Sequence, residues 1–313
     1  MLDRLAAAIG RHLVVPGGDT AVPHLLLAGV DEEWKSIDRL YEPMICFVVE
    51  GAKRVTSGDV TAIAGPGELL FTPLHLPAVV DLVKVPYRSA VLRLDAGTVT
   101  ELLMELESYE GYREDGEARR GRGDRGYARP APQGLVSTAL TPALADAVAR
   151  WVELLDSPED IGPLAARTES EILYRLLRSD LGPLLREAFL TDSATSRVRV
   201  AARWIKERYD QPLSVEEIAA VAHMSAAGLH RHFKAATGMT PLKYQKRLRM
   251  QEARRRLLSE GESAAQVAHA VGYSSATQFN REYRSEYGLP PGQDAARLRA
   301  EPGVYPAPGR VSP

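Results

Sequence analysis

The chain has 313 residues, of which 45% are hydrophobic and 26% charged, and its formal net charge is −2 at pH 7. This length predicts two domains, and the apolar content is sufficient for two cores. No apolar run approaches the roughly 18 residues of a membrane span. The single cysteine, Cys46, excludes an internal disulfide and fits a reducing cytoplasm.

The first part of the chain changes from a helical to a strand pattern. Residues 1–12 are too short and too charged for a signal peptide and predict an amphipathic helix. From about residue 21, short apolar or alternating runs are separated by glycine and proline, which is typical of strands. Their spacing predicts a small sandwich or barrel of jelly-roll type. The predicted strands are 45–49, 60–63, 69–72, 79–83 and 90–94.

A helix predicted over 98–110 is followed by a polar tract, residues 111–132, made largely of Gly, Arg, Asp and Glu. Such a segment cannot bury enough surface to offset its ordering entropy, so it predicts a disordered surface loop. An Arg-Gly arm on nucleic acid is the alternative, but the interleaved acids favour the loop. Apolar residues at helical spacing after Thr141 and after Glu169 predict a helical region over 133–192. Its apolar faces are expected to pack in a core, in a dimer interface, or in both.

Residues 214–241 and 263–291 carry the same pattern twice, and Ser225 of the first copy corresponds to Ser274 of the second. In each copy a serine caps a helix, a turn follows, and a second helix has buried apolar positions at i and i+4 before it ends at glycine. One helix-turn-helix is a weak signal, whereas two in tandem are a strong one. The repeat therefore predicts that this chain binds DNA.

The spacing and charge of this region agree with that prediction. Residues 241–258 predict one helix about 27 Å long, which would hold two recognition helices near the ~34 Å that separates successive major grooves. Residues 196–300 hold 18 Lys and Arg against 10 Asp and Glu, a net of +8, and the remainder has a net of −10. A basic domain attracts phosphates, and an acidic one does not.

Particular stretches identify a family. The sequence MSAAGLHRHFK at 224–234, followed by GMTPLKY at 238–244, resembles the DNA-binding domain of AraC/XylS-type transcription regulators, as do 249–258 and 267–279. Residues 41–55 and 66–70 resemble the cupin-like amino-terminal domain attached to one branch of these regulators. The chain departs from the family pattern at 290–294. Family members often have an aromatic-Arg pair after the last Gly-x-x-Pro, whereas this chain has Pro-Pro-Gly-Gln-Asp. This difference concerns the packing of the last helix.

The resemblance and the helical pattern together predict the DNA contacts. The residues predicted to face bases are Ala227, His230, Arg231, Ala276, Thr277, Asn280 and Arg281. An arginine projecting into the major groove contacts guanine O6 and N7. The residues predicted to meet phosphates are Ser225, Lys234, Thr240, Lys243, Arg247, Ser274 and Arg284.

The expected fold class is α+β. A cupin-like jelly-roll or barrel domain with flanking helices (1–110) is followed by the loop (111–132) and a helical linker or dimerisation region (133–192). An all-helical domain with two helix-turn-helix units joined by a long helix (196–300) precedes a flexible tail (301–313). The resemblance implies operator DNA and a small effector as partners, with RNA polymerase and a second copy of the chain as candidates.

The effector is expected to be small and largely apolar, and the candidate pocket residues are Cys46, Arg54 and His75. Cys46 is either a buried hydrophobe or a sensor thiol for an aldehyde, quinone or oxidant. No cofactor, metal ligand set or catalytic residue is expected. The alternative function, a metal-dependent cupin enzyme tethered to DNA, would need clustered His, Glu and Asp ligands, whereas His12, His24 and His75 are scattered.

Overall fold

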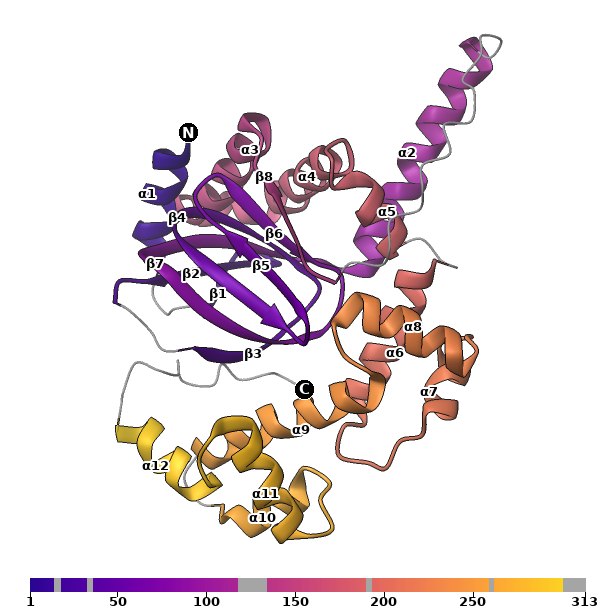
Figure 1. Ribbon diagram of the computed structural model, residues 1–313. Helices are drawn as coiled ribbons and strands as arrows, with labels where there is room; N and C mark the ends of the chain where they lie inside the picture. The colour runs from indigo at the N-terminus through magenta and orange to yellow at the C-terminus, as the bar shows by residue number, and fades with distance from the viewer. Residues whose placement is uncertain (14–17, 33–35, 118–133, 190–192, 259–261, 301–313) are drawn as a thin grey trace.

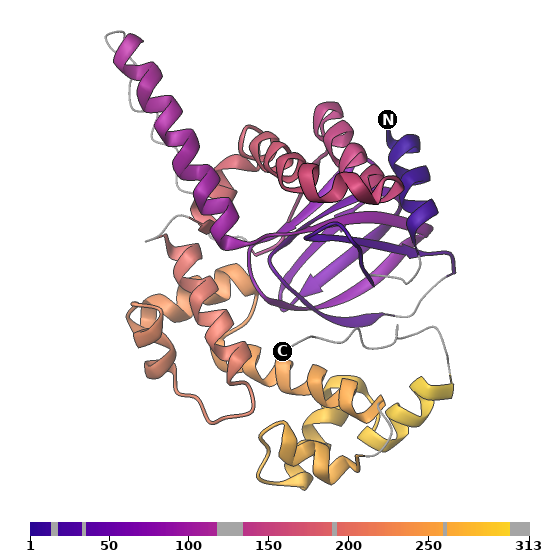
Figure 2. The same ribbon diagram turned by 180° about the vertical axis from the view of Figure 1, so that it is seen from behind.

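The computed structural model describes residues 1–13, 18–32, 36–117, 134–189, 193–258 and 262–300. An antiparallel sheet with helices against it forms the N-terminal half, and a group of helices forms the C-terminal half beneath it (Figure 1). The view from behind shows the same two parts, again with the sheet above the C-terminal helices, and α2 projects away from both (Figure 2). The predicted α+β fold class is confirmed.

Two long strands organise the sheet, whose order is β1-β2-β7-β4-β6-β8, with β3 paired to β7 and β5 to β4. Because β4 and β7 pair with different neighbours along their lengths, the sheet bends into a barrel that encloses an apolar interior, including Cys46, Val55 and Leu70. The strands are β1 (Gly18–Asp19), β2 (Leu25–Val30), β3 (Ile37–Tyr41), β4 (Met44–Ser57), β5 (Val60–Ala64), β6 (Glu68–Thr72), β7 (Leu76–Arg93) and β8 (Val136–Ala139).

Both long strands run through residues that were expected to end them. The strands predicted at 79–83 and 90–94 are one strand, β7, because Pro86 lies opposite register shifts in β4, where no ladder donor is required. Gly51 of β4 has φ +68°, and a Cβ there would lie 2.3 Å from the Pro86 carbonyl oxygen. Glycine therefore allows the bulge that bends β4.

Helices cover the outer face of the sheet. Ile45, Phe47 and Leu92 pack against α1, α3 and α4, and Trp151 of α3 is fully buried in this core. Thr141 caps α3, where its side chain accepts a hydrogen bond from the Leu144 amide. These helices are α1 (Leu2–His12), α2 (Ala96–Glu117), α3 (Pro142–Glu153), the 3-10 turn η1 (Leu154–Asp156), α4 (Pro158–Leu177) and α5 (Gly182–Phe189).

The helix predicted over 98–110 is longer than expected. It begins at Ala96 and continues to Glu117, so the first residues of the predicted loop are helical. Extending an existing helix avoids the cost of nucleation, which explains how a polar segment can continue it. The rest of that loop, with the Arg-Gly run at 119–123, lies outside the described residues, as does the tail at 301–313.

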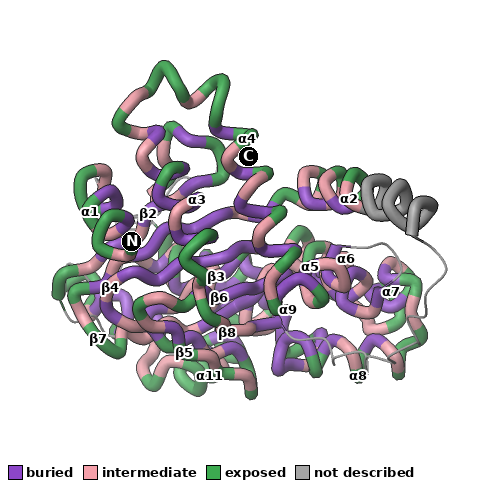
Figure 3. The backbone as a smooth tube through the Cα atoms, turned by 90° about the horizontal axis from the view of Figure 1, so that it is seen from above, coloured by how far each residue is buried: buried purple, intermediate pink, exposed green. Residues whose placement is uncertain are grey.

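The C-terminal half contains α6 (Ala194–Glu207), α7 (Val215–Val221), α8 (Ala226–Thr237), α9 (Pro241–Leu258), α10 (Ala264–Ala270), α11 (Ala276–Tyr287) and α12 (Pro291–Ala300). One core is formed by α6–α8 with the start of α9, and a second by the end of α9 with α10–α12. Seen from above, buried residues run along the strands of the sheet, and exposed residues lie on turns and on the outer surfaces of the helices (Figure 3). None of the helices in the described residues combines the length and apolar character of a membrane span.

Candidate DNA-binding surface and barrel interior

The first helix-turn-helix has the predicted local chemistry. Ser214 and Glu217 form a capping box at the start of α7, and the Ser225 side chain accepts a hydrogen bond from the Gly228 amide at the start of α8. Gly238 ends α8 in the left-handed conformation. The buried positions are Leu229 and Phe233, and the exposed face carries Ala227, His230, Arg231 and Lys234.

The second unit repeats this arrangement with one correction. A capping box opens α10 at Ser263, but the residue that caps α11 is Ser275, not Ser274. The extra residue of the second copy therefore lies in the turn, where Gly272 (φ +86°) approaches the Asp210 carbonyl and leaves no room for a Cβ. Phe279 and Tyr283 are buried, and the exposed face carries Ala276, Thr277, Asn280, Arg281 and Arg284.

The cations in the first half of α9 differ in what they contact. At its start, the Thr240 side chain accepts a hydrogen bond from the Lys243 amide at 3.3 Å, and the Lys243 side chain is exposed. Arg247, predicted to meet phosphate, instead faces the barrel and forms ion pairs with Asp38 of β3 and Glu286 of α11. The Arg247 side chain is 15% exposed. In this structure its guanidinium is paired with these two carboxylates and not available to a phosphate.

Asp38 is the centre of this contact between the halves. Its carboxylate is 6% exposed and accepts hydrogen bonds from Arg247 and, at 2.6 Å, from Nη1 of Arg254. Arg254 also donates from Nε to Asp294 of α12 at 2.9 Å and lies 4.2 Å from the centre of the Tyr287 ring. One barrel residue is thereby linked through α9 to both α11 and α12.

Further polar contacts hold α9 and α6 against the barrel. The Tyr244 hydroxyl donates to the His75 carbonyl at 2.6 Å, and Gln251 donates to the carbonyls of Arg39 and Ala78. Lys206 of α6 lies 3.4 Å from a Glu42 carboxylate oxygen. Sequence reasoning missed this interface, because its polar residues are ordinary for a solvated helix face and their partners are distant in sequence.

The three residues predicted to form an effector pocket do not lie together. Cys46 is fully buried inside the barrel, whereas Arg54 is exposed on the outer face of β4. His75 lies at the junction with α6, where burial and the nearby charges of Lys206 and other α6 cations lower its pKa to about 3. The structure therefore does not bring these three side chains together, and Cys46 is the one of them that faces the barrel interior.

The barrel interior around Cys46 also holds a charged residue that the sequence analysis did not select. Lys53, 5% exposed, donates from Nζ to Cys46 Sγ at 3.1 Å and to the Tyr41 hydroxyl at 3.4 Å. Its ammonium also lies within 6 Å of the Tyr41 and Tyr87 rings, at 5.4 and 5.7 Å from their centres. A lysine facing inward could have been noticed only if the bulge in β4 were known.

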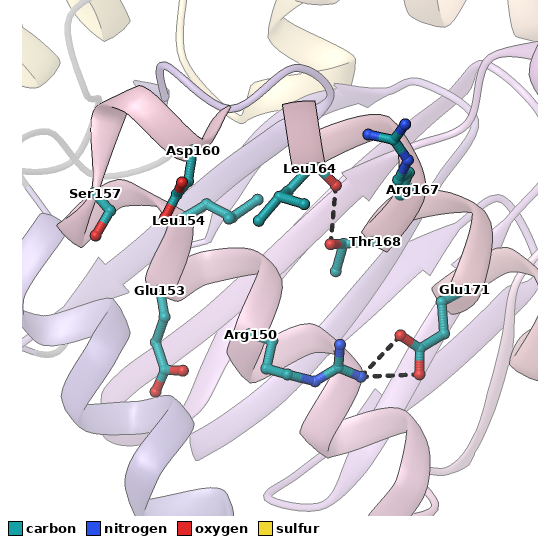
Figure 4. Close-up of a pocket in the computed structure, with 9 residues that line it drawn as sticks. All are labelled: Arg150, Glu153, Leu154, Ser157, Asp160, Leu164, Arg167, Thr168 and Glu171. Atoms are coloured by element: carbon teal, nitrogen blue, oxygen red, sulfur yellow. Dashed lines mark hydrogen bonds and ion pairs between the residues drawn. The ribbon is translucent and has the colours of Figure 1, made fainter. Parts of the chain in front are cut away.

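A groove of about 440 Å³ lies elsewhere, on the helical layer between α3 and α4 (Figure 4). Arg150 donates two 2.8 Å hydrogen bonds to Glu171 across it, and Leu154 and Leu164 line its apolar side. None of the predicted effector residues lines this groove. Over the described ranges, no three His, Cys, Asp or Glu side chains gather closely enough to hold a metal ion.

Two matches to protein-family models identify the family to which this chain belongs. Residues 21–184, more than half of the chain, match the AraC-type transcriptional regulator N-terminus, and residues 218–297 match a helix-turn-helix domain. The chain belongs to the AraC family of transcriptional regulators. Its N-terminal half contains the N-terminal domain of that family, and its C-terminal half contains the helix-turn-helix domain.

Individual relatives agree with this membership. The transcriptional activator RhaS of Pectobacterium carotovorum is 33% identical over 139 residues, which are 44% of this chain and 47% of RhaS. RhaS of Klebsiella pneumoniae is 32% identical over 143 residues, 45% of this chain and 49% of that protein. The chain thus matches about half the length of these curated relatives.

The overall architecture has a counterpart among solved structures. A single-residue variant of ToxT from Vibrio cholerae, in its apo form, superimposes over 90% of this chain and 99% of its own with a TM-score of 0.53 and 11% identity. At this identity the likeness concerns the fold alone, and it covers both halves of the molecule.

Proposed function

We propose that this AraC-family regulator recognises a specific operator by placing α8 and α11 in successive major grooves. The observation that carries the proposal is the match between the two exposed faces. Arg231 and Arg281 each lie two residues beyond a fully buried aromatic or aliphatic anchor, Leu229 or Phe279, and both are exposed. The proposed base-facing residues are Ala227, His230, Arg231, Ala276, Thr277, Asn280 and Arg281, and the proposed phosphate contacts are Ser225, Lys234, Thr240, Lys243, Ser274 and Arg284.

The proposed division between base and phosphate contacts is tested by two substitutions. Arg281→Ala should relax the preference for one or two operator positions by about 1–3 kcal/mol, because a bidentate contact to guanine is lost. Lys243→Ala should weaken binding to all sequences about equally and reduce the salt slope by roughly one unit. Affinity profiles over single-base operator variants, at several salt concentrations, distinguish the two effects.

Arg255→Ala is a suitable control, because this exposed arginine is paired with Glu252 on α9 and should leave both profiles unchanged. A uniform shift over every operator variant in Arg281→Ala would assign that side chain to the backbone instead.

The DNA-binding half should also act alone. We expect a fragment of residues 193–300 to fold and bind DNA, with an affinity that falls steeply as salt rises. The fragment begins at Ser193 because this residue caps α6, whose buried face completes the first core. Circular dichroism and a salt titration of DNA binding are the measurements. An unfolded fragment, or binding that does not depend on salt, would contradict the prediction.

We propose further that the barrel interior receives the effector and that α9 transmits its presence. The contacts of Asp38 and His75 with α9 support this route, since movement of β3 or of the loop before β7 displaces the helix that joins the two DNA-binding units. The coupling must be reciprocal, so operator DNA should change effector affinity by the same factor.

A second copy of this chain and RNA polymerase remain proposed partners. The alternative of a metal-dependent enzyme is tested by metal analysis of the purified full-length protein, in which stoichiometric iron or manganese would favour it. We propose action by binding, not catalysis, because family membership accounts for both halves of the chain.

A further inference from the structure

The barrel interior contains a nucleophile and an amine in direct contact. Cys46 Sγ lies 3.1 Å from Lys53 Nζ and 3.5 Å from the Tyr87 hydroxyl, and Nζ lies 3.4 Å from the Tyr41 hydroxyl. All four residues are at least nine-tenths buried, and the surrounding side chains are apolar, including Val48, Val55 and Leu70.

The path of β4 explains how these two side chains meet. Seven positions of regular strand would separate their backbones by about 23 Å and point them to opposite faces. Register shifts between Val48 and Lys53 change this alternation, and the bend at Gly51 turns the second half of the strand back over the interior. A bulge that re-aims a side chain toward a neighbour is typical of functional sites.

The electrostatics of this pair are unusual for a core. In the described part of the chain, the hydrogen-bond partners of Lys53 are Cys46 and Tyr41 and not a carboxylate, although a buried charge is normally paired with one. Burial raises the pKa of the Cys46 thiol, but the Lys53 charge outweighs it and leaves that pKa below its ordinary value. Burial lowers the pKa of Lys53, but the neighbouring thiol and phenols outweigh it and raise that pKa, so each member of the pair favours the charged form of the other.

One polar atom beside the pair is unsatisfied. Ser89 is 0% exposed, and its hydroxyl lies near Cys46 and Tyr87, yet it makes no hydrogen bond of acceptable geometry in the described part of the chain. A fully buried hydroxyl without a partner costs about 1–3 kcal/mol. A ligand that places an oxygen atom beside the Ser89 hydroxyl would form the missing hydrogen bond and recover part of that cost.

We propose that Cys46 and Lys53 form a capture site for a one-carbon aldehyde, which they bind covalently as a methylene bridge between Sγ and Nζ. This proposal specifies the effector chemistry of the barrel and rests on the sensing role proposed above. The two nucleophilic atoms are so close that a single tetrahedral carbon can join them with a small adjustment of the Lys53 side chain.

The reaction balances with the groups present. The Cys46 thiolate adds to the carbonyl carbon and forms the S–C bond, and the carbonyl oxygen takes a proton from the Lys53 ammonium. Ser89 and the Tyr87 hydroxyl are placed to hydrogen-bond that oxygen. The neutral Lys53 amine then forms the N–C bond, and the hydroxyl leaves as water with a second proton from nitrogen. Thiolate, aldehyde and ammonium give the bridged product and one water, with no change in net charge and no oxidant.

The burial of Cys46 favours small electrophiles over large ones. Cys46 is 0% exposed, so an electrophile reaches it only through local opening of the barrel. A small, uncharged molecule crosses such an opening more readily than a quinone or a long-chain enal. Bridging also joins two points of β4 on either side of its bend, which would fix the strand conformation that positions β3 and β7 against α9.

The test uses the full-length protein with formaldehyde as the probe and mass spectrometry as the readout. We expect a mass gain of one carbon atom on the peptide of residues 40–54, with loss of tryptic cleavage after Lys53. Cys46→Ser should abolish this bridge, and Lys53→Met should do the same. Lys84→Met, which removes an exposed lysine of β7, should leave it unchanged.

Persistence of the bridge in Cys46→Ser would overturn the proposal, and so would modification confined to exposed lysines while Cys46 remains a free thiol. Cys46→Ser alone decides the matter if Lys53→Met does not fold. The mass measurement requires no DNA, so a failure to form the bridge is distinguishable from a failure to bind the operator. A protein that forms the bridge but binds no operator would contradict the proposed function and still support the capture site.

Discussion

Replacing Asp294 with alanine is expected to lower the free energy of unfolding by about 3–5 kcal/mol, because it removes the carboxylate from a buried network. The Asp294 side chain is 0% exposed. It accepts hydrogen bonds from Arg254 Nε and the Tyr283 hydroxyl, both at 2.9 Å, and from Arg297 at 2.8 Å. Chemical denaturation of the full-length protein is the measurement.

The control for Asp294 is Glu216→Ala, which removes an exposed acid from the first turn of α7 and should change stability by no more than about 0.5 kcal/mol. Asp294→Asn preserves the shape and an acceptor for Tyr283 and should cost less than the alanine substitution. Equal stability of Asp294→Ala and the wild-type protein would mean that α12 is not held by this network.

The same residue gives a pH dependence with a defined sign. Burial raises the pKa of Asp294, but hydrogen bonds from Arg297 and Arg254 outweigh it and hold that pKa below its ordinary value. A depressed folded-state pKa contributes stability that is present above the unfolded value of about 3.9 and is lost as pH falls toward the folded value. The stability difference between wild type and Asp294→Asn should therefore be constant near neutrality and shrink below about pH 4.

The helix-turn-helix units could be predicted because their signals are local. Ser214 with Glu217, Ser225, and Gly238 each act within one or two turns of their own helix, and the chain supplies the pattern twice. The misplaced residue, Ser274, lies beside Ser275 at the one insertion between the copies. Two adjacent serines both satisfy a capping pattern, and only the backbone geometry selects between them.

The position of Asp294 illustrates an intermediate case. The sequence Pro-Pro-Gly-Gln-Asp was noticed as a departure from the family pattern that affected the packing of the last helix. The structure shows that Asp294 itself anchors α12 through arginines of α9 and α12. A lone acid after a proline predicts a solvated first turn, and nothing local reveals Arg254 and Tyr283, the two donors outside its own helix.

The barrel interior could not be predicted, because side-chain direction there depends on a bulge. Strand alternation puts Cys46 on the face opposite Ile45 and Phe47, as in the structure, but continued alternation would place Lys53 on the other face from Cys46. The change of register in β4 depends on Gly51 and its contact with β7, which is a tertiary effect. The same bend separates Arg54 from the interior.

The contact between Asp38 and α9 yields the prediction with the most direct consequence for DNA binding. We expect Asp38→Asn to raise DNA affinity about tenfold, or about 1.4 kcal/mol, and to steepen the salt slope by about 0.9. The reason is that Arg247 and Arg254 each lose a carboxylate that is 6% exposed, while the net positive charge beside α9 rises by one. Arg247 is then held only by Glu286 among these contacts and can reach a phosphate.

Asp81→Asn is the matched control for Asp38→Asn. Asp81 lies on β7 opposite Arg54 and accepts a hydrogen bond from Ser36, so its removal changes the charge of the barrel by the same amount without touching α9. If tighter binding reflects released arginines, Asp38→Asn alone should show it, and amide exchange along α9 should quicken in that variant. Equal gains in DNA affinity in both variants would mean that the change in overall charge alone explains the effect. Weaker binding in Asp38→Asn would instead mean that docking of α9 on β3 holds the two recognition helices in the geometry that DNA requires.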